Sequence, residues 1–184
     1  MSMHDMTAAN LRSAHGGESM AHMRYKIWGK KADRDGFPNV ARLFQAISHA
    51  ETVHASNHFA ELKKEAGAFD VNSVAGFGLG STSENLDGAM EGESFEIREM
   101  YPVYLESARF QKEEGAQRSF RYALSAEKQH FEMFKNAKSV VDNGSDIELD
   151  PVQICEVCGH TVEGDAPDEC PVCGVKKKMF TAFK

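Results

Sequence analysis

What this chain lacks narrows its class before any motif is considered. Its 184 residues contain no run of about 18 apolar residues, so no segment is expected to span a membrane. Residues 1–17 show no basic stretch followed by an apolar one, which predicts that there is no signal peptide and that the protein is cytoplasmic. Basic residues are in deficit, with 21 Lys and Arg against 28 Asp and Glu. The net charge of −7, without a basic stripe, argues against nucleic acid as a partner.

Cysteine is scarce as well, and all of it lies in two Cys-x-x-Cys-Gly turns near the C-terminus. The thiols are those of Cys155, Cys158, Cys170 and Cys173. Four thiolates from two tight turns suit a tetrahedral zinc or iron ion, and ligand type alone does not separate the two metals. Disulfides are the alternative, but they are disfavoured in a chain without a signal peptide. We expect a linker at residues 146–151 and a small separate domain over residues 151–184.

Two motifs in the longer N-terminal part place a carboxylate and an imidazole three residues apart. They are Glu51-x-x-His54 and Glu127-x-x-His130, and on a helix each pair shares one face. Steps of three and four residues from each pair pass through apolar side chains, which indicates that both pairs lie on core-facing stripes. These neighbours are Val40, Phe44, Ile47, Phe120, Ala123 and Phe134. A glutamate inside such a stripe is costly unless it is paired or bound to a metal.

Two further helical stretches carry a single glutamate in the middle of an apolar stripe, Glu18 in the first and Glu93 in the third. The order Glu, Glu-x-x-His, Glu, Glu-x-x-His is the ligand set of ferritin-like di-metal bundles. The order Glu, then Glu-x-x-His, thus occurs twice and forms an internal repeat. Glu96 has no counterpart in the first copy of this repeat, where Ala21 stands at the corresponding position.

The fold class that we predict is mainly α, a four-helix bundle over residues 1–145 followed by the small four-cysteine domain. The helices are expected to end near Lys31, Glu65, Lys112 and Asn143, with a local kink at Pro102 in the third. Residues 67–82 contain apolar side chains among glycine and serine, so we expect one long crossover packed along the bundle. Ser81 and Glu84 resemble a capping box that opens the third helix.

The ordered set of motifs resembles rubrerythrin from about residue 16 to the C-terminus. The motifs are Gly17-Glu18-Ser19-Met20, Glu51-x-x-His54, Gly92-Glu93-x-x-Glu96, Glu99-Met100-Tyr101-Pro102, Glu127-x-x-His130 and the terminal Cys-Pro-x-Cys-Gly. The resemblance implies a ferritin-like bundle with two irons in a carboxylate-bridged site, and a rubredoxin-like domain with one iron on four cysteines. Zinc remains a possible substitute at the cysteines, although a redox-active site nearby favours iron.

The resemblance also implies a role for each ligand. Glu51 and Glu127 bridge the two irons, and Glu18 is a terminal ligand of one of them. Glu93 and His130 belong to the other iron.

Glu96 and His54 are alternative ligands of the iron that Glu18 binds, the carboxylate in the oxidised state and the imidazole in the reduced state. A harder, more highly charged diferric pair suits an additional carboxylate, whereas neutral imidazole is sufficient for the diferrous pair. Ala21 at the corresponding position means that only one iron exchanges ligands in this way.

Other polar side chains near the ligands are expected to support them or to serve the core. Tyr25 and Tyr101 are close enough along their helices to hydrogen-bond carboxylate ligands, and core tyrosines paired elsewhere are the alternative. His58 is expected beside the ligands or in the core, and His49 and His160 at the surface. Five methionines are assigned to core packing: Met20, Met23, Met90, Met100 and Met133.

These assignments predict a non-haem di-iron peroxidase that reduces hydrogen peroxide to water. Electrons return one at a time through the cysteine-bound iron from an external reductase or electron carrier. The resemblance implies a homodimer in which the Cys module of one subunit lies near the di-iron pair of the other, and exchange of helices between subunits stays open.

Three other readings of the same residues stay open at this stage. One is a ferritin-like protein that oxidises and stores iron, which requires a large hollow assembly. Another is an oxygen-activating hydroxylase or a dimanganese catalase, although seven protein ligands would crowd an organic substrate at the metals. The last is an interaction protein without enzymatic turnover, in which zinc stabilises the four-cysteine domain. Such a protein would be colourless.

Overall fold

The first two helices form a hairpin in the computed structural model, which describes residues 3–184. Helix α1 (Asp5–Asp35) ends where Gly36 adopts the left-handed φ of 90°. The N–H groups of Gly36 and Phe37 donate hydrogen bonds to carbonyl groups of the last turn of the helix. Helix α2 (Pro38–Glu61) starts at once, with its proline where a helix needs no N–H donor. The first helix thus ends later than Lys31 and the second earlier than Glu65.

The third helical segment of the bundle is interrupted by a π-helical turn. It consists of α3 (Thr82–Phe95), the π-helical turn η1 (Glu96–Met100) and α4 (Tyr101–Phe110). The capping box at Ser81 and Glu84 is confirmed, with Ser81 N–H donating to Glu84 Oε2 over 2.8 Å. The irregularity expected at Pro102 is displaced into the preceding turn, where the Tyr101 N–H bonds back to the carbonyl of Glu96. The wider turn precedes the proline, which has no N–H to continue the ladder.

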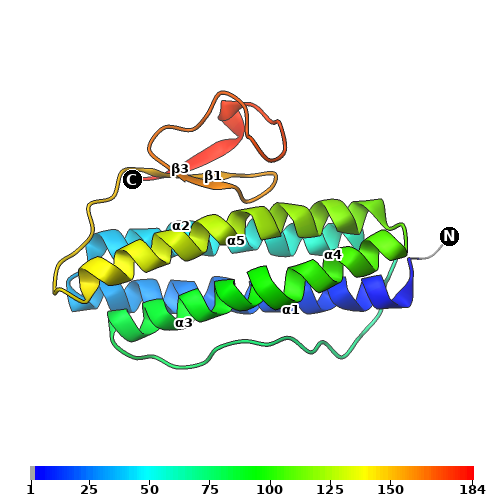
Figure 1. Ribbon diagram of the computed structural model, residues 1–184, viewed down its shortest axis with the longest axis horizontal. Coiled ribbons are helices and arrows are strands. Elements are labelled where there is room, and N and C mark those ends of the chain that lie inside the picture. Colours follow the sequence, from blue (N-terminus) through cyan, green and yellow to red (C-terminus); the bar gives the residue numbers. More distant parts are fainter. Residues whose placement is uncertain (1–2) are drawn as a thin grey trace.

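Helix α5 (Glu114–Val141) completes the bundle, and a single long crossover over residues 62–81 joins α2 to α3. Figure 1 shows the crossover running along the outer side of α1 and α3. It is fastened to α1, because Ser13 Oγ donates to Asn72 O and Trp28 Nε1 donates to Gly78 O.

The crossover lies along the bundle as expected, but its apolar side chains stay outside the core. Phe77 is 92% exposed and Val74 is 70% exposed, and Phe69 and Val71 are also exposed. Met23 on the neighbouring α1 is likewise exposed rather than part of the core. The helices of the bundle fill its interior with their own apolar stripes, so the side chains of the crossover remain outside it.

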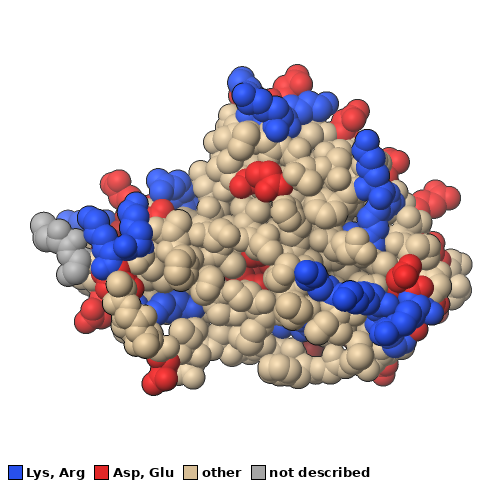
Figure 2. All heavy atoms as spheres, turned by 180° about the vertical axis from the view of Figure 1, so that it is seen from behind, with Lys and Arg blue, Asp and Glu red and all other residues tan. Residues whose placement is uncertain are grey.

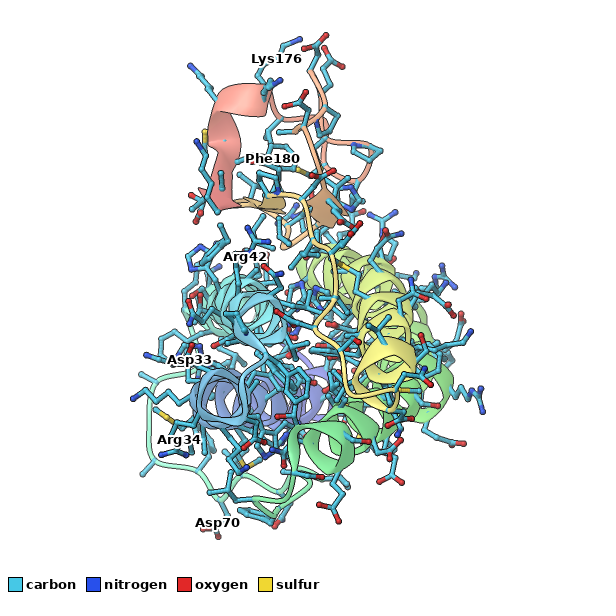
Figure 3. All side chains as sticks on the ribbon, turned by 90° about the vertical axis from the view of Figure 1, so that its left-hand side faces the viewer. Asp33, Arg34, Arg42, Asp70, Lys176 and Phe180 are labelled. Carbon is cyan, nitrogen blue, oxygen red and sulfur yellow. The ribbon has the colours of Figure 1, made fainter. Side chains whose placement is uncertain are left out.

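The small domain contains a three-stranded antiparallel sheet. Strand β1 (Val152–Cys155) lies between β2 (Thr161–Glu163) and β3 (Phe180–Phe183), and the short helix η2 (Lys177–Met179) precedes β3. Side chains of β1 pack on α2, with Val152 and Ile154 against Ala46 and Ala50. Seen end-on in Figure 3, the small domain with Lys176 and Phe180 sits on one side of the bundle, and Asp70 of the crossover lies on the opposite side.

The segment between the bundle and β1 is held against the bundle. Both oxygens of Asp146 accept from backbone N–H groups at the start of α2, those of Asn39 at 2.8 Å and Val40 at 3.2 Å. A carboxylate at this position also complements the positive end of the helix dipole. Asn39 Nδ2 donates to Ile147 O, and the Arg42 guanidinium donates to Leu149 O. The residues that we expected to form a linker are thus fixed at several points.

Two apolar clusters fill the ends of the bundle and leave a polar layer between them. One is built around Tyr25, Phe44 and Phe134, where the rings of Phe44 and Phe134 lie 5.1 Å apart. The other is built around Tyr101 and Phe120. The polar layer is therefore shielded from water on both sides along the bundle axis.

Two surface properties bear on the environment of the protein. Within residues 3–184 no helix is both long and apolar enough to cross a bilayer. Figure 2 shows acidic and basic side chains interspersed on the rear face, with a broad uncharged area between them.

Candidate metal centres

The polar layer of the bundle gathers glutamates and histidines from α1, α2, α3 and α5. Six of the predicted ligands are at most 1% exposed: Glu18, Glu51, His54, Glu93, Glu127 and His130. They form two groups, and within each group the ligand atoms lie within 4.8 Å of one another. One group contains Glu18 and His54, the other contains Glu93 and His130, and Glu51 and Glu127 belong to both. This is the arrangement of two cations that share two carboxylates.

Each imidazole directs its Nδ1 atom into its group. His54 Nδ1 lies 2.8 Å from Glu51 Oε2, 3.0 Å from Glu127 Oε1 and 3.7 Å from Glu18 Oε1. His130 Nδ1 lies 2.7 Å from Glu127 Oε2, 3.3 Å from Glu51 Oε1 and 3.8 Å from Glu93 Oε2. A single nitrogen cannot donate to three carboxylates, so the convergence of these atoms is better suited to a cation between them.

Carboxylate oxygens in this layer lack hydrogen-bond donors within the described chain. The atoms are Glu18 Oε2, Glu51 Oε1, Glu93 Oε2 and Glu127 Oε1. A buried anionic oxygen without a partner is costly, and a bound cation removes that cost. The donor set of oxygen and imidazole nitrogen suits iron among other divalent metals. The residues therefore fit a di-metal centre.

The pKa values of the buried glutamates in the metal-free protein also indicate that this layer favours bound positive charge. Burial, together with the charge of Glu127, raises the pKa of Glu93 to about 8 and that of Glu18 well above its usual value. Burial also opposes ionisation of Glu127, but the imidazoles of His54 and His130 outweigh it and lower its pKa. In the protein without metal, the carboxyl groups of Glu18 and Glu93 therefore retain protons that cations would displace.

Glu96 is the one predicted bundle ligand that the structure does not bring into either group. It lies at the start of the π-helical turn, is 9% exposed, and has no hydrogen bond to the described protein. Its side chain lines a cavity under the crossover. Of the two alternative ligands expected beside Glu18, the structure places His54 in the group and leaves Glu96 outside it.

The two predicted tyrosines do hydrogen-bond carboxylates, each across the bundle. Tyr25 OH donates to Glu93 Oε1 over 2.6 Å, and Tyr101 OH donates to Glu18 Oε1. Burial, followed by the charge of the adjacent glutamate, raises the pKa of both phenols, so they remain donors.

His58 is buried and supports Tyr101. Its Nε2 lies 3.0 Å from Tyr101 OH, and its Nδ1 lies 2.7 Å from Ser119 Oγ. Because Tyr101 gives its only proton to Glu18, His58 Nε2 has to carry a hydrogen, and the Ser119 hydroxyl donates to Nδ1. Burial and the proximity of His54 lower the pKa of His58 to about 3, which keeps it neutral. Ser119 escaped the sequence analysis, although a serine on an otherwise apolar stripe was a usable signal.

The four cysteines of the small domain are unpaired thiols that face one another. Cys155 Sγ lies 3.6 Å from Cys173 Sγ, and Cys158 Sγ lies 3.5 Å from Cys170 Sγ. All four sulfurs lie within 4.8 Å of each other, as a single tetrahedrally coordinated ion requires. The disulfide alternative is therefore wrong.

The first Cys-x-x-Cys-Gly turn lies directly against the bundle centre. Gly159, with φ 78°, approaches the His54 imidazole, and Thr161 Oγ1 lies 2.8 Å from His130 Nε2. The Thr161 hydroxyl also donates to Gly159 O over 3.1 Å. Contact between a Cys module and a bundle was expected between two subunits, whereas here the module lies on the bundle of its own chain.

This contact corrects one prediction and adds a residue that the sequence analysis missed. His160 is 9% exposed rather than at the surface, because the turn is pressed against the bundle. His49 does face outward and pairs with Glu156 at 2.8 Å. Thr161 was missed, since nothing in the sequence indicates which residue after a Cys turn meets a histidine of another element.

Similarity to known proteins extends over nearly the whole chain. The family model described as rubrerythrin matches residues 9–138, and the model of the rubredoxin-like domain of rubrerythrin matches residues 153–181. Rubrerythrin-2 of Clostridium acetobutylicum is 52% identical over 180 residues, which cover 97% of each chain. Nigerythrin of Nitratidesulfovibrio vulgaris is 31% identical, over 96% of this chain and 86% of its own.

Solved structures agree with these sequence matches. The fully reduced, all-ferrous state of nigerythrin superposes with a TM-score of 0.84 at 31% identity, covering all of this chain and 89% of that one. A bacterioferritin of Mycobacterium tuberculosis has a TM-score of 0.69 at 16% identity, covering 78% of this chain and 90% of its own, which shows a shared fold alone.

Proposed function

Because the chain belongs to the rubrerythrin family, we propose that it is a non-haem di-iron peroxidase that reduces hydrogen peroxide to water. The observation that carries the proposal is the pair of buried ligand groups sharing Glu51 and Glu127, next to a four-cysteine module. The reaction consumes two electrons and two protons for each peroxide and gives two waters. When bound, two ferrous ions supply these two electrons, and the cysteine-bound iron accepts replacements singly from a carrier.

The proposed ligand roles follow from the two groups. Glu51 and Glu127 would bridge the metals, because each belongs to both groups. Glu18 and His54 would complete one site. Glu96 would take the place of His54 in the oxidised state, and its position at a π-helical turn supports such a movement, since these turns are common at functional sites.

Glu93 and His130 would complete the other site. Tyr25 holds one oxygen of Glu93, so the second oxygen remains free to face a metal. Tyr101 does the same for Glu18, and His58 holds Tyr101 in turn. These hydrogen bonds fix the orientation of the carboxylates and tune how strongly they donate to the metal.

The surroundings of the site favour a reaction confined to the centre. The apolar clusters on both sides exclude water along the bundle axis, which strengthens the electrostatic interactions within the layer. The Cys module contacts both histidines, so electrons have a short route from one metal centre to the other. An external electron carrier, a homodimeric assembly and a cytoplasmic location remain parts of the proposal.

An anaerobic experiment tests the function directly. The iron-loaded protein is fully reduced, one equivalent of hydrogen peroxide is added, and the absorption of both iron chromophores is followed. We expect the di-iron centre to re-oxidise quickly and the cysteine-bound iron to follow. In a Cys170→Ser variant, the di-iron centre should still oxidise once, but repeated turnover should stop. Slow or absent re-oxidation in the unaltered protein would contradict the peroxidase proposal.

The storage alternative makes a different prediction about size. Light scattering of the purified protein should show a small oligomer rather than a cage of many subunits. A large hollow particle would favour iron storage instead.

A further inference from the structure

A cavity of about 480 Å³ lies under the crossover, between α1 and α3. This volume is within the range of about 300–1,000 Å³ that is typical of sites for small organic molecules. Its lining combines apolar side chains, those of Trp28, Val74, Phe77 and Phe95, with polar ones, those of Arg24, Glu84, Asn85 and Glu91. Hydrogen peroxide has only two heavy atoms and needs neither this volume nor apolar walls.

The inner end of the cavity reaches Glu96, the predicted ligand that lies outside both ligand groups. Gly17 and Gly92 line the cavity, and they directly precede the ligands Glu18 and Glu93. A β-carbon at Gly17 would lie 2.9 Å from Ser73 Oγ, and one at Gly92 would lie 3.4 Å from the Arg24 guanidinium, so neither position has room for a larger side chain. Glu96 also lines the cavity, is more than nine-tenths buried, and has no hydrogen-bond partner in the described protein. A polar group of a ligand can therefore reach the Glu96 carboxyl while its apolar part remains in the cavity.

The cavity and the Cys module are on opposite sides of the bundle. The crossover covers α1 and α3, whereas the module rests on α2 and α5 (Figures 1 and 3). A molecule in the cavity would therefore not compete with the route by which electrons reach the centre.

We propose that this cavity binds the organic group of an alkyl or aryl hydroperoxide, with the O–O group directed at Glu96 and the di-iron centre. The inference rests on the proposed peroxidase function and names a further substrate class for it. The O–O bond of ROOH is cleaved, and two electrons from the reduced centre and two protons give ROH and H₂O. The electrons are replaced through the cysteine-bound iron, as for hydrogen peroxide.

The first test measures binding without turnover. Trp28 is the only tryptophan of the chain and forms part of the cavity wall, with its Nε1 bonded to Gly78 O of the crossover. Cumyl alcohol, the redox-inert product of cumene hydroperoxide, is titrated into the full-length metal-loaded protein. We expect a saturable change in Trp28 emission with a Kd below about 1 mM. The absence of any saturable change would overturn the proposal.

The second test compares two substrates in the unaltered enzyme and in a variant with a narrowed cavity. Gly76 lines the cavity, its φ is outside the left-handed region, and a β-carbon there meets no atom within 4 Å. Gly76→Leu should therefore fold normally and reduce the space. We expect kcat/KM for cumene hydroperoxide to fall about tenfold or more, with hydrogen peroxide changing less than about twofold. Ala68→Leu, on the exposed start of the same crossover, is the matched control and should change neither value.

The outcomes separate the two proposals. If hydrogen peroxide is reduced but cumene hydroperoxide is not, the organic-substrate proposal is wrong and the peroxidase function stands. If Gly76→Leu lowers kcat/KM equally for cumene hydroperoxide and hydrogen peroxide, or lowers it for neither, the cavity does not hold the organic group. If neither peroxide is reduced, the peroxidase proposal itself fails, whatever the fluorescence titration gives.

Discussion

A β-carbon on Gly159 would overlap the imidazole of His54, because the backbone of the first Cys-x-x-Cys-Gly turn lies against Nε2 of that ring. The closeness is possible only for glycine, which also tolerates the left-handed φ of 78°. One metal centre is thereby positioned against a proposed ligand of the other, with no side chain between them.

The first prediction concerns this contact. Gly159→Ala should displace either the turn or His54 and slow electron transfer between the two centres, with both iron spectra retained. Stopped-flow re-reduction of the di-iron centre measures the effect. Gly174→Ala is the control, because Gly174 has the corresponding place in the second turn and a φ of 77°, but its β-carbon would meet nothing within 4 Å. Both variants carry about 1–2 kcal/mol of backbone strain, so an equal slowing in both would contradict a role for the His54 contact.

The second prediction concerns Thr161, whose hydroxyl donates to Gly159 O and therefore accepts from the Nε2–H of His130. Thr161→Val keeps the shape but removes the hydroxyl. Since partners of this kind orient metal-bound histidines, we expect iron affinity at the bundle site to fall about 10–100-fold. Competition with a chelator measures the affinity. Thr161→Ser should restore most of it, and a valine variant that binds iron as tightly as the serine variant would refute the assignment.

The third prediction concerns Tyr101. In Tyr101→Phe, Glu18 loses its donor and His58 Nε2 is left without an acceptor, so unfolding should become easier by about 1–3 kcal/mol. Iron binding beside Glu18 should weaken as well. Chemical denaturation and iron titration test the two effects. Tyr104→Phe removes a hydroxyl that bonds Ser13 and no carboxylate ligand, and should leave iron binding unchanged.

The fourth prediction concerns pH. In the metal-free protein burial raises the pKa of Glu93 to about 8, and it raises that of Glu18 as well, from the usual 4.5. Between pH 4.5 and 8 the folded state therefore binds more protons than the unfolded chain, so its stability falls as pH rises through this window. The Tm of metal-free protein should decrease from pH 5 to pH 8.

Metal binding should reverse that trend. Cations compete with protons for the carboxylates, so the difference in Tm between iron-loaded and metal-free protein should widen toward pH 8. Glu93→Gln should flatten the pH dependence of the metal-free protein, because the amide does not titrate. A metal-free protein whose Tm is constant over this range would contradict the argument.

The bundle and its ligand layer were predictable because each rests on a local pattern. Glu51 and His54 lie on an apolar stripe, and a helix places residues three apart on one face whatever surrounds it. Each Cys-x-x-Cys turn likewise brings its own two thiols to one side, and two such turns in one short domain predict a single site. Such features depend on the spacing of residues along one element, which the sequence states directly.

What could not be predicted depends on how elements meet. No residue type announces the π-helical turn at Glu96, which moves that carboxylate out of the ligand groups. The burial of His160 and the exposure of Phe77 follow from docking of the module and the route of the crossover. Spacing along one segment contains no information on the position of another segment beside it.

The clamp of Asp146 on the first turn of α2 has a consequence for how the protein is supplied with electrons. A module on a loose tether could swing out, collect an electron and return, and its rate would then vary with solvent viscosity. Because the segment before the module is held on α2, the proposed electron donor would have to come to the module. Three of its four cysteines are buried and Cys173 alone is partly exposed, so we expect electrons to be delivered on the side of the module where Cys173 lies.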